Sequence, residues 1–288
     1  MPELPEVETI RRGLSQFIVT KKLTKTTILC EKSFQGTPLT GTVTAVRRFG
    51  KALIIDLATG WSLMIHLRMT GQLIYDGHGK ERYAAGHPSD NFIAVLPNKQ
   101  TRVILEFDSG TLYFNDQRKF GFIKTLPTVA VADDSFIKKL APEPWVMSPA
   151  DFYDRLQRHH NSCIKATILD QSIICGLGNI YADESLFMSH IHPERRAGSL
   201  TREEATSLLL AARAVMEQSI ASGGSTMATY VKADGTKGDY LEKFAQVFRR
   251  EGKPCRLCGT TIVKTRVAGR GTHICPHCQP KPEEVQNA

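Results

Sequence analysis

Residues 255–278 read CRLCGTTIVKTRVAGRGTHICPHC, and this stretch decides the fold of the C-terminal end of the chain. Its two Cys-x-x-Cys pairs are sixteen residues apart, which is the spacing of two zinc knuckles. Four thiolates fill a tetrahedron and leave no open coordination position, so we predict one structural zinc ion. The expected ligands are Cys255, Cys258, Cys275 and Cys278. A redox pair or chance spacing is the competing interpretation.

The segment between the knuckles, residues 262–271, is predicted to form a strand, a turn and a second strand with cations at the tip. Such a hairpin suits a DNA groove or backbone, although a solvated basic loop would have the same composition. Between residues 243 and 280 there are eight Lys or Arg and one acid, so this segment carries +7 of the net charge of +8. A polyanionic partner should therefore bind the C-terminal end.

The composition is that of a globular protein, with 288 residues of which 41% are hydrophobic. The seven cysteines are an odd number, which argues against a disulfide framework. No run of about 18 apolar residues is present, and the acidic N-terminus does not resemble a signal peptide. We expect a soluble, cytoplasmic protein.

The hydrophobic pattern changes along the chain. Apolar residues recur every three or four positions from residue 4 to 17, which predicts a leading amphipathic helix. Short β-branched and aromatic stretches follow, at 42–46, 52–57, 61–67, 102–107 and 111–114, and they predict an antiparallel β-sandwich. From Ser148 onward the pattern is helical, and Thr201 to Glu204 form a capping box before a helix that ends near Gly223.

These patterns predict an α+β, multidomain chain. We expect an N-terminal β-sandwich domain at residues 1–130 and a linker at 131–147. A helical domain should follow at 148–243, then the four-cysteine zinc finger at 244–280 and a tail at 281–288.

The N-terminus reads Met1-Pro2-Glu3-Leu4-Pro5-Glu6. If Met1 is removed, Pro2 has a free secondary amine, and α-amino groups have a pKa of about 7.7 to 8.0. Such an amine can attack an electrophilic carbon and form a cationic iminium, while Glu3 moves the protons. The competing interpretation is that the prolines stiffen the terminus and the glutamates favour the start of a helix.

Gly176-Leu177-Gly178-Asn179 stands between two helical patterns. Two glycines allow a ligand to approach the backbone closely, and the N–H groups of the following helix can bind a phosphate. A plain turn is the other interpretation.

Taken together, these stretches resemble the formamidopyrimidine-DNA glycosylase family of bacterial base-excision repair, over nearly the whole chain. The segments that carry the resemblance are the PELPEVE start at residues 2–8, RFGK at 48–51, IHLRMTG at 65–71, RKFG at 118–121, GLGNIYA at 176–182, and the four-cysteine finger.

The resemblance implies a β-sandwich with a leading helix, then a helix-two-turn-helix domain with the zinc finger, and DNA bound between the two domains. It makes Pro2 the nucleophile that attacks C1′ of the damaged nucleotide. Glu3 is the matching proton donor, and Lys51 is the matching second acid for β-elimination. Arg270 matches the arginine associated with δ-elimination. The expected partner is double-stranded DNA with oxidised bases or abasic sites, bound by a monomer.

Chemistry on a base within a duplex requires the nucleotide to be flipped out, which leaves a hole in the stack. Met69, Arg118 and Phe120 match the residues with which the family fills this hole. Taken alone, each is more often an ordinary residue: a strand methionine, an exposed arginine and a core phenylalanine. The family positions near the phosphates are matched by a further set: His66, Gln100, His160, Lys165 and Asn179.

Two departures from the family pattern bear on specificity. Gln100 replaces a DNA-contacting histidine, so that contact is in question. In the loop expected to close over the flipped base, Met227-Ala228-Thr229-Tyr230 lacks the usual basic and acidic pair, so base selectivity could differ.

We therefore expect a DNA glycosylase that excises oxidised purines, namely 8-oxoguanine and formamidopyrimidines, and then cleaves the abasic site by β,δ-elimination. The alternatives are an endonuclease-VIII-like glycosylase for oxidised pyrimidines and a non-catalytic zinc-finger DNA-binding protein. The side chains at 4, 69, 118 and 120 favour the purine branch, and an intact Pro2-Glu3 argues against plain binding.

Overall fold

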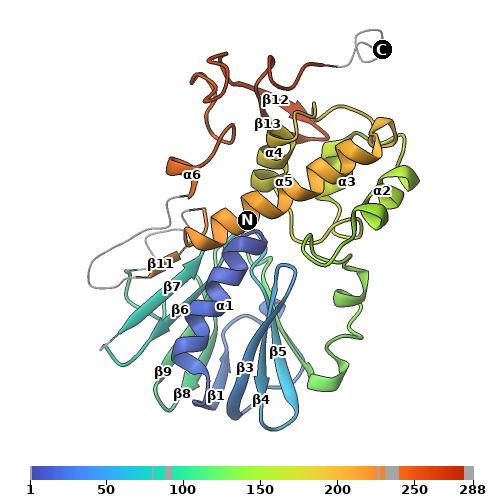
Figure 1. Ribbon diagram of the computed structural model, residues 1–288. Coiled ribbons are helices and arrows are strands. Elements are labelled where there is room, and N and C mark those ends of the chain that lie inside the picture. Colours follow the sequence, from blue (N-terminus) through green and yellow to red (C-terminus); the bar gives the residue numbers. More distant parts are fainter. Residues whose placement is uncertain (1, 80, 88–92, 226–227, 231–239, 282–288) are drawn as a thin grey trace. The chain divides into compact units, whose positions relative to one another are not determined.

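The computed structural model describes residues 2–79, 81–87, 93–225, 228–230 and 240–281 (Figure 1). The chain divides into two compact units. One comprises residues 1–138 with 220–239, and the other comprises 139–219 with 240–288. The segment after residue 219 groups with the first unit, and strand β11 within it pairs with strand β7. The domain limits given above stay a prediction.

The first unit begins with helix α1 (Leu4–Ile18) and continues as strands. The expected leading helix is therefore confirmed. The strands are β1 (Lys22–Ile28), β2 (Phe34–Gln35), β3 (Gly41–Phe49), β4 (Ala52–Leu57), β5 (Trp61–His66), β6 (Gly71–Asp76), β7 (Arg82–Gly86), β8 (Thr101–Phe107), β9 (Gly110–Asp116), β10 (Phe122–Pro127) and β11 (Ala228–Tyr230).

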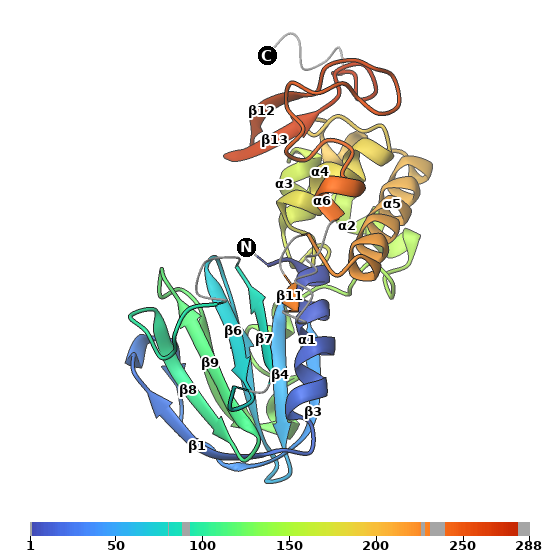
Figure 2. The same ribbon diagram turned by 90° about the vertical axis from the view of Figure 1, so that its left-hand side faces the viewer.

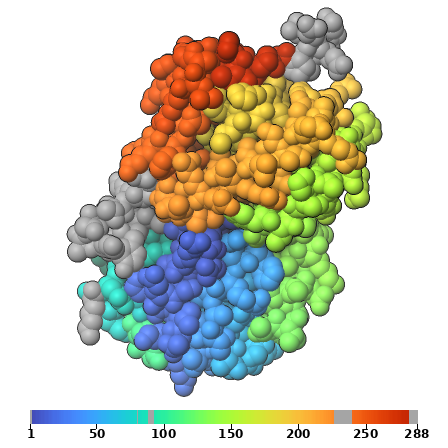
Figure 3. Space-filling model, viewed as in Figure 1, coloured from blue at the N-terminus to red at the C-terminus, as the bar shows by residue number. Residues whose placement is uncertain are grey.

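The strands follow the order β11-β7-β6-β9-β8-β1-β3-β4-β5-β10-β2. Their pairings are antiparallel, except that β2 and β10 run parallel. One buried hydrophobic cluster joins side chains of β4 and β5 with side chains of β6, β8 and β9, and the apolar face of α1 belongs to it. Figures 1 and 2 show α1 beside β3 and β7, with which it is in contact. In Figure 3 the same helix, in dark blue, forms part of the surface of this unit.

The second unit is helical and ends in a small hairpin. The Ser148 side chain caps the first helix by accepting from the Asp151 N–H, as expected. The capping box at Thr201 is also confirmed: its hydroxyl accepts from the Glu204 N–H, and its own N–H donates to the Glu204 carboxylate. The elements are α2 (Pro149–Arg158), α3 (Ile164–Leu169), α4 (Asn179–Met188), α5 (Arg202–Ala221), α6 (Tyr240–Lys243), β12 (Val263–Val267) and β13 (Arg270–Ile274).

The fold class expected from the sequence is confirmed, with a leading helix, a sheet-rich unit, a helical unit and a C-terminal hairpin. Within the described residues, no helix has the length and apolar character needed to cross a bilayer.

Candidate functional site

The start of α1 holds Pro2 and Glu3 in a buried position. Glu3 is the N-cap residue, and its N–H donates to Glu6 Oε2 at 2.9 Å, while its own carboxylate accepts from the Glu6 N–H. This capping box fixes the direction in which the chain enters the helix. Pro2 is therefore held just before the first helical turn, next to a carboxylate, as the proposed nucleophile requires. Met1 lies outside the described residues.

Glu6 also anchors the chain that precedes β11. Its Oε1 accepts from the Ser225 N–H at 3.0 Å and from the Ser225 hydroxyl at 2.8 Å. Residues 226 and 227 lie outside the described residues, as do the side chains of 228–230, so the expected effect of the Met227–Tyr230 sequence on base selectivity stays a prediction.

Lys51 and His66 are brought to one end of the sheet by strand pairing. Lys51 lies in the tight turn before β4, and the next residue, Ala52, pairs with His66 at the end of β5. Phe122 at the start of β10 pairs with the other side of His66. Both the lysine and the histidine are buried. The β4–β5 hairpin thus brings Lys51 and His66 to the same end of the sheet.

His66 is neutral at physiological pH. Burial lowers its pKa to about 3, with a further contribution from the charges of Arg68 and Lys51. Its Nδ1 accepts a hydrogen bond from the Arg68 N–H at 3.0 Å, so the ring proton resides on Nε2. The imidazole can therefore donate to an acceptor such as a phosphate oxygen without carrying a charge.

Glu8 on α1 joins the helix to the turn before Lys51. Its carboxylate accepts from Arg11 at 2.8 Å and from Arg48 at 3.2 Å, and also from Arg12. The Arg48 guanidinium donates in addition to the Gly50 carbonyl at 3.0 Å. Burial alone would raise the pKa of Glu8, but the arginine hydrogen bonds outweigh it and lower the pKa to about 2.

We expect these ion pairs of Glu8 to stabilise the folded protein at neutral pH and to lose this effect in acid. The folded-state pKa of Glu8 lies below its ordinary value of 4.5, so its contribution is complete above pH 4.5 and declines as the pH falls toward 2. Glu8→Gln should cost about 2 to 3 kcal/mol of unfolding free energy at pH 7 and much less at pH 3. Urea unfolding of both proteins at the two pH values measures this difference. An equal loss at both values would contradict it.

The proposed stack-filling side chains lie on two exposed loops of the first unit. Met69 is 39% exposed in the turn between β5 and β6, and Phe120 is 54% exposed between β9 and β10. The Arg118 guanidinium lies 4.8 Å from the centre of the Phe120 ring. On an exposed loop, an aromatic ring can stack against a base while the neighbouring cation donates hydrogen bonds to the edge of a base.

Gln100 precedes β8, and its carbonyl accepts from the Asp116 N–H.

In the helical unit, Asn179 contacts the β12–β13 hairpin, which carries Arg270. Asn179 is the first residue of α4, and its Nδ2 donates to the Gly271 carbonyl at 2.9 Å. Arg270 opens β13 and is exposed. The preceding turn, Ala268-Gly269, has positive φ at both residues (48° and 72°), which matches a two-residue hairpin turn. The predicted strand-turn-strand is confirmed, and it presents Arg270 to solvent.

Lys165 is fully buried in the helical unit. Its ammonium donates to Asp183 Oδ1 at 2.6 Å, to the Thr272 hydroxyl at 2.7 Å and to the Gly271 carbonyl at 3.1 Å. The other Asp183 oxygen accepts from the His273 N–H at 3.0 Å. These contacts account for the three protons of the ammonium and join α3 and α4 to β13. For Lys165 we therefore expect a structural role in place of the phosphate contact that the resemblance implied. A phosphate contact of the exposed His160 stays a prediction.

Lys165→Met should destabilise the helical unit by about 3 to 5 kcal/mol, because removing one partner leaves a buried charge without compensation. Lys165→Met/Asp183→Asn should lose less than the sum of the two single variants. Urea unfolding followed by circular dichroism gives these values.

The same Lys165→Met variant distinguishes a structural lysine from a phosphate ligand. Loss of a phosphate contact would lower the slope of log affinity against log salt by about 1. We expect an unchanged slope for duplex DNA.

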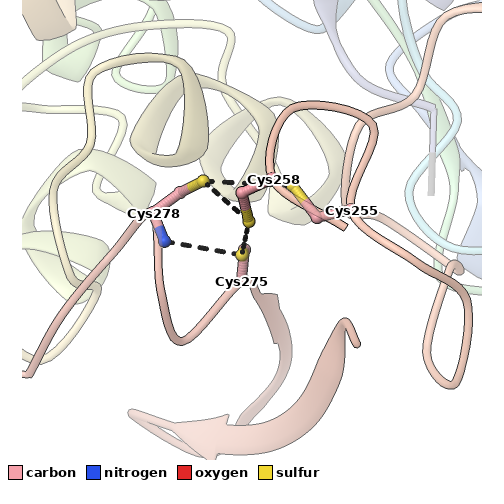
Figure 4. A group of neighbouring side chains, drawn as sticks. All are labelled: Cys255, Cys258, Cys275 and Cys278. Carbon is pink, nitrogen blue, oxygen red and sulfur yellow. Dashed lines mark hydrogen bonds between the residues drawn. The ribbon is translucent and has the colours of Figure 1, made fainter. Parts of the chain in front are cut away.

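The four cysteines of the finger come together as predicted (Figure 4). Their Sγ atoms all lie within 4.8 Å of one another, and the Cys258–Cys275 and Cys255–Cys278 pairs are 3.4 and 3.9 Å apart. Zinc–sulfur bonds of about 2.3 Å in a tetrahedron require sulfur atoms about 3.8 Å apart, so the cluster fits zinc. His273 hydrogen-bonds to Asp183 and lies outside this ligand set.

Two buried carboxylates have roles that were not expected from the sequence. Asp116 contacts both loops that carry the stack-filling residues, and Asp183 holds Lys165 and His273. The only local signal for Asp116 was a short polar side chain just before a turn, which is common.

Comparison with known proteins matches three family models to the chain in order. They describe the formamidopyrimidine-DNA glycosylase N-terminal domain at residues 1–123, the helix-two-turn-helix (H2TH) domain of that enzyme at 140–231, and the zinc finger found in this glycosylase and in IleRS at 252–281. The chain is therefore an H2TH protein with a structural zinc finger.

Similarity to individual proteins extends over the full length. The formamidopyrimidine-DNA glycosylase of Desulfitobacterium hafniense is 40% identical, with 97% of this chain and all of the relative aligned. That of Listeria innocua is 38% identical over the same shares. The structure of the Lactococcus lactis enzyme bound to DNA with an abasic site has a TM-score of 0.83 at 30% identity, and it covers 97% of this chain and all of the other. The Thermus thermophilus enzyme has a TM-score of 0.82 at 34% identity, over 98% and 100%. The chain belongs to the formamidopyrimidine-DNA glycosylase family.

Proposed function

We propose that this protein is a DNA glycosylase and abasic-site lyase that removes oxidised purines from duplex DNA. The observation that carries the proposal is the buried Pro2-Glu3 pair at the start of α1, in a chain that aligns with these glycosylases from end to end. A protein that only bound DNA would have no need of a terminal secondary amine.

In the first step, the Pro2 nitrogen bonds to C1′ of the flipped nucleotide as the bond from C1′ to the damaged base breaks. The base leaves with the proton that the Pro2 nitrogen gives up. Glu3 is placed to give a proton to the sugar ring oxygen as the ring opens, which leaves a cationic iminium between Pro2 and C1′. The iminium withdraws electrons from C2′ and so acidifies its hydrogen.

Two eliminations follow from this iminium. Loss of a proton from C2′ expels the 3′ phosphate, and loss of a proton from C4′ expels the 5′ phosphate. We assign Lys51 as the second acid of the first elimination, and Arg270 to hold the phosphates at the second. His66, as a neutral donor, suits a phosphate oxygen near the lesion. Hydrolysis of the remaining imine then frees Pro2 for another cycle.

In this protein the zinc ion has a structural role and no chemical one. All four ligands are thiolates, so no position is open for water or substrate. The finger instead fixes the hairpin that carries Arg270. Its cations contribute salt-dependent affinity for the DNA backbone.

The test is to incubate the Met1-processed protein with a duplex that carries 8-oxoguanine opposite cytosine, and to add borohydride. We expect a covalent adduct that peptide mapping places on Pro2. The absence of any adduct would overturn the catalytic proposal. The L. lactis relative has also been seen with oxidised-pyrimidine DNA, so a second duplex carries such a lesion. An adduct with this duplex alone would assign the protein to the pyrimidine branch.

The relatives named above are bacterial. We propose that the protein acts in the bacterial cytoplasm, on the DNA of the nucleoid, as a monomer.

A further inference from the structure

We infer that Asp116 is a positioning residue that sets opposite-base discrimination, because its carboxylate joins the turn that carries Met69 to the loop that carries Arg118 and Phe120. This inference rests on the proposed function, in which these three side chains fill the space left by the flipped nucleotide.

The Asp116 carboxylate is fully buried at the end of β9. Its Oδ1 accepts from the Thr70 hydroxyl and from the Arg118 N–H at 3.1 Å. Its Oδ2 accepts from the Gly121 N–H at 2.7 Å. The Arg118 N–H is also 3.1 Å from the Thr70 oxygen, which closes a ring of hydrogen bonds. One side chain thus binds both ends of the 118–121 loop and the residue that follows Met69.

The main chain of Asp116 is fixed as firmly as its side chain. Its N–H donates to the Gln100 carbonyl at 2.9 Å, and its carbonyl accepts from Arg102 Nε at 2.7 Å. In the sheet it pairs with Gly71, the first residue of β6. The carboxylate therefore projects from a rigid strand end, so movement of the two loops relative to that strand must break its hydrogen bonds.

Each of the two turns is tight enough to require glycine. A Cβ on Gly121 would lie 2.8 Å from the Phe114 ring and 3.2 Å from Asp116 Oδ2. A Cβ on Gly71 would lie 2.3 Å from the Leu67 carbonyl oxygen. The loops themselves adopt left-handed backbone at Arg68 (φ 50°) and Lys119 (φ 57°). The arrangement is a strained double turn held by one carboxylate.

The side chains that would meet DNA lie on the exposed side of this anchor. Residues 117–120 are exposed, while Asp116 and Gly121 on either side are buried. A donor can select one base edge over another only if its position is fixed to within a fraction of an ångström. Because the Arg118 main chain is bonded to Asp116 and Thr70, its position is set before DNA binds. Weakening the hydrogen bonds between Asp116, Thr70 and Arg118 should therefore affect the choice of the opposite base more than the chemistry at Pro2.

The decisive variants are Thr70→Val, which removes the hydroxyl at nearly constant volume, and Thr70→Ser, which keeps it. Asp116→Asn is a third variant, since either orientation of the amide leaves an NH₂ group facing an N–H donor. Two quantities are measured in single turnover: the ratio of 8-oxoguanine excision opposite cytosine to excision opposite adenine, and the rate of loop insertion, reported by a fluorescent base opposite the lesion. Strand cleavage at a preformed abasic site and the thermal unfolding midpoint serve as controls.

We expect Thr70→Val to lower the excision ratio and the insertion rate by about threefold to tenfold, and Asp116→Asn by about tenfold or more, since hydrogen bonds to a charged acceptor are the stronger ones. Thr70→Ser should match the unmodified protein. Unchanged ratio and insertion rate in folded Thr70→Val would overturn the inference, as would an equal loss in Thr70→Ser. If the unmodified protein forms no borohydride adduct with any lesion, it is the proposed function that fails.

Discussion

A chain that keeps a residue in front of Pro2 is expected to lose both base excision and strand cleavage. With Met1 retained, or with one glycine inserted before Pro2, the proline nitrogen becomes an amide, and an amide has no lone pair free to attack C1′. We expect the rate to fall by on the order of 10³-fold or more, because the covalent route is then closed. Mass spectrometry verifies the terminus of each sample, and single-turnover cleavage of an 8-oxoguanine duplex gives the rate.

The matched control is Pro2→Gly with Met1 removed. This variant keeps a terminal α-amine of comparable pKa but makes it primary, so it should still form a trappable, though less reactive, adduct. The blocked chain should keep its affinity for a duplex with an uncleavable abasic analogue, because the zinc hairpin and the stack-filling loops are unaltered. A borohydride adduct from the blocked chain would show that another amine is the nucleophile, and the buried Lys51 is the first candidate to map.

Features that depend on neighbours in the sequence were predictable. The leading helix followed from its apolar period, and the caps at Ser148 and Thr201 from their short motifs. The zinc cluster followed from cysteine spacing, because metal geometry requires four ligands at fixed distances. The hairpin between the knuckles followed from β-branched residues on either side of Ala268-Gly269.

Other strands could not be predicted from the sequence, for a physical reason. β7 contains Ala84, Ala85 and Gly86, which have low intrinsic preference for strands, and it forms because its neighbours β6 and β11 provide hydrogen-bond partners. β2 is only two residues long and pairs in parallel with β10, almost ninety positions away, so no local pattern marks it.

The same distinction, between features set by sequence neighbours and features set by distant pairing, applies to the site residues. The sequence could place Lys51 just before a strand and His66 within one, but only the register of β4 with β5 brings them together. Asp116 acts on Thr70 from 46 positions away, and Lys165 on Thr272 from 107. A buried lysine is rare, and no local pattern in the sequence marks Lys165 as one. Its burial follows from Asp183, which supplies the compensating charge.

Removal of the zinc ligands is expected to unfold the finger and to remove much of the affinity for DNA. The apolar support of this module is small and consists of Phe187, Val247 and Ile262 around the two buried cysteines, Cys255 and Cys275. Structural zinc contributes about 10 to 16 kcal/mol in comparable modules, so such a cluster cannot replace it. Cys275→Ala/Cys278→Ala should bind no zinc in a colorimetric assay and should lose the β12–β13 hairpin.

The loss of the hairpin has a quantitative consequence for DNA binding. Lys264, Arg266 and Arg270 are exposed on it, and each phosphate contact contributes about 0.9 to the salt slope. Fluorescence anisotropy at several salt concentrations should therefore give a slope smaller by about 2 to 3 in the double variant. Cys163→Ser, at a half-buried cysteine outside the cluster, is the matched control and should bind as the unmodified protein does. Full affinity and an unchanged slope in the double variant would show that the finger does not bind the DNA backbone, and the assignment of Arg270 would then fall with it.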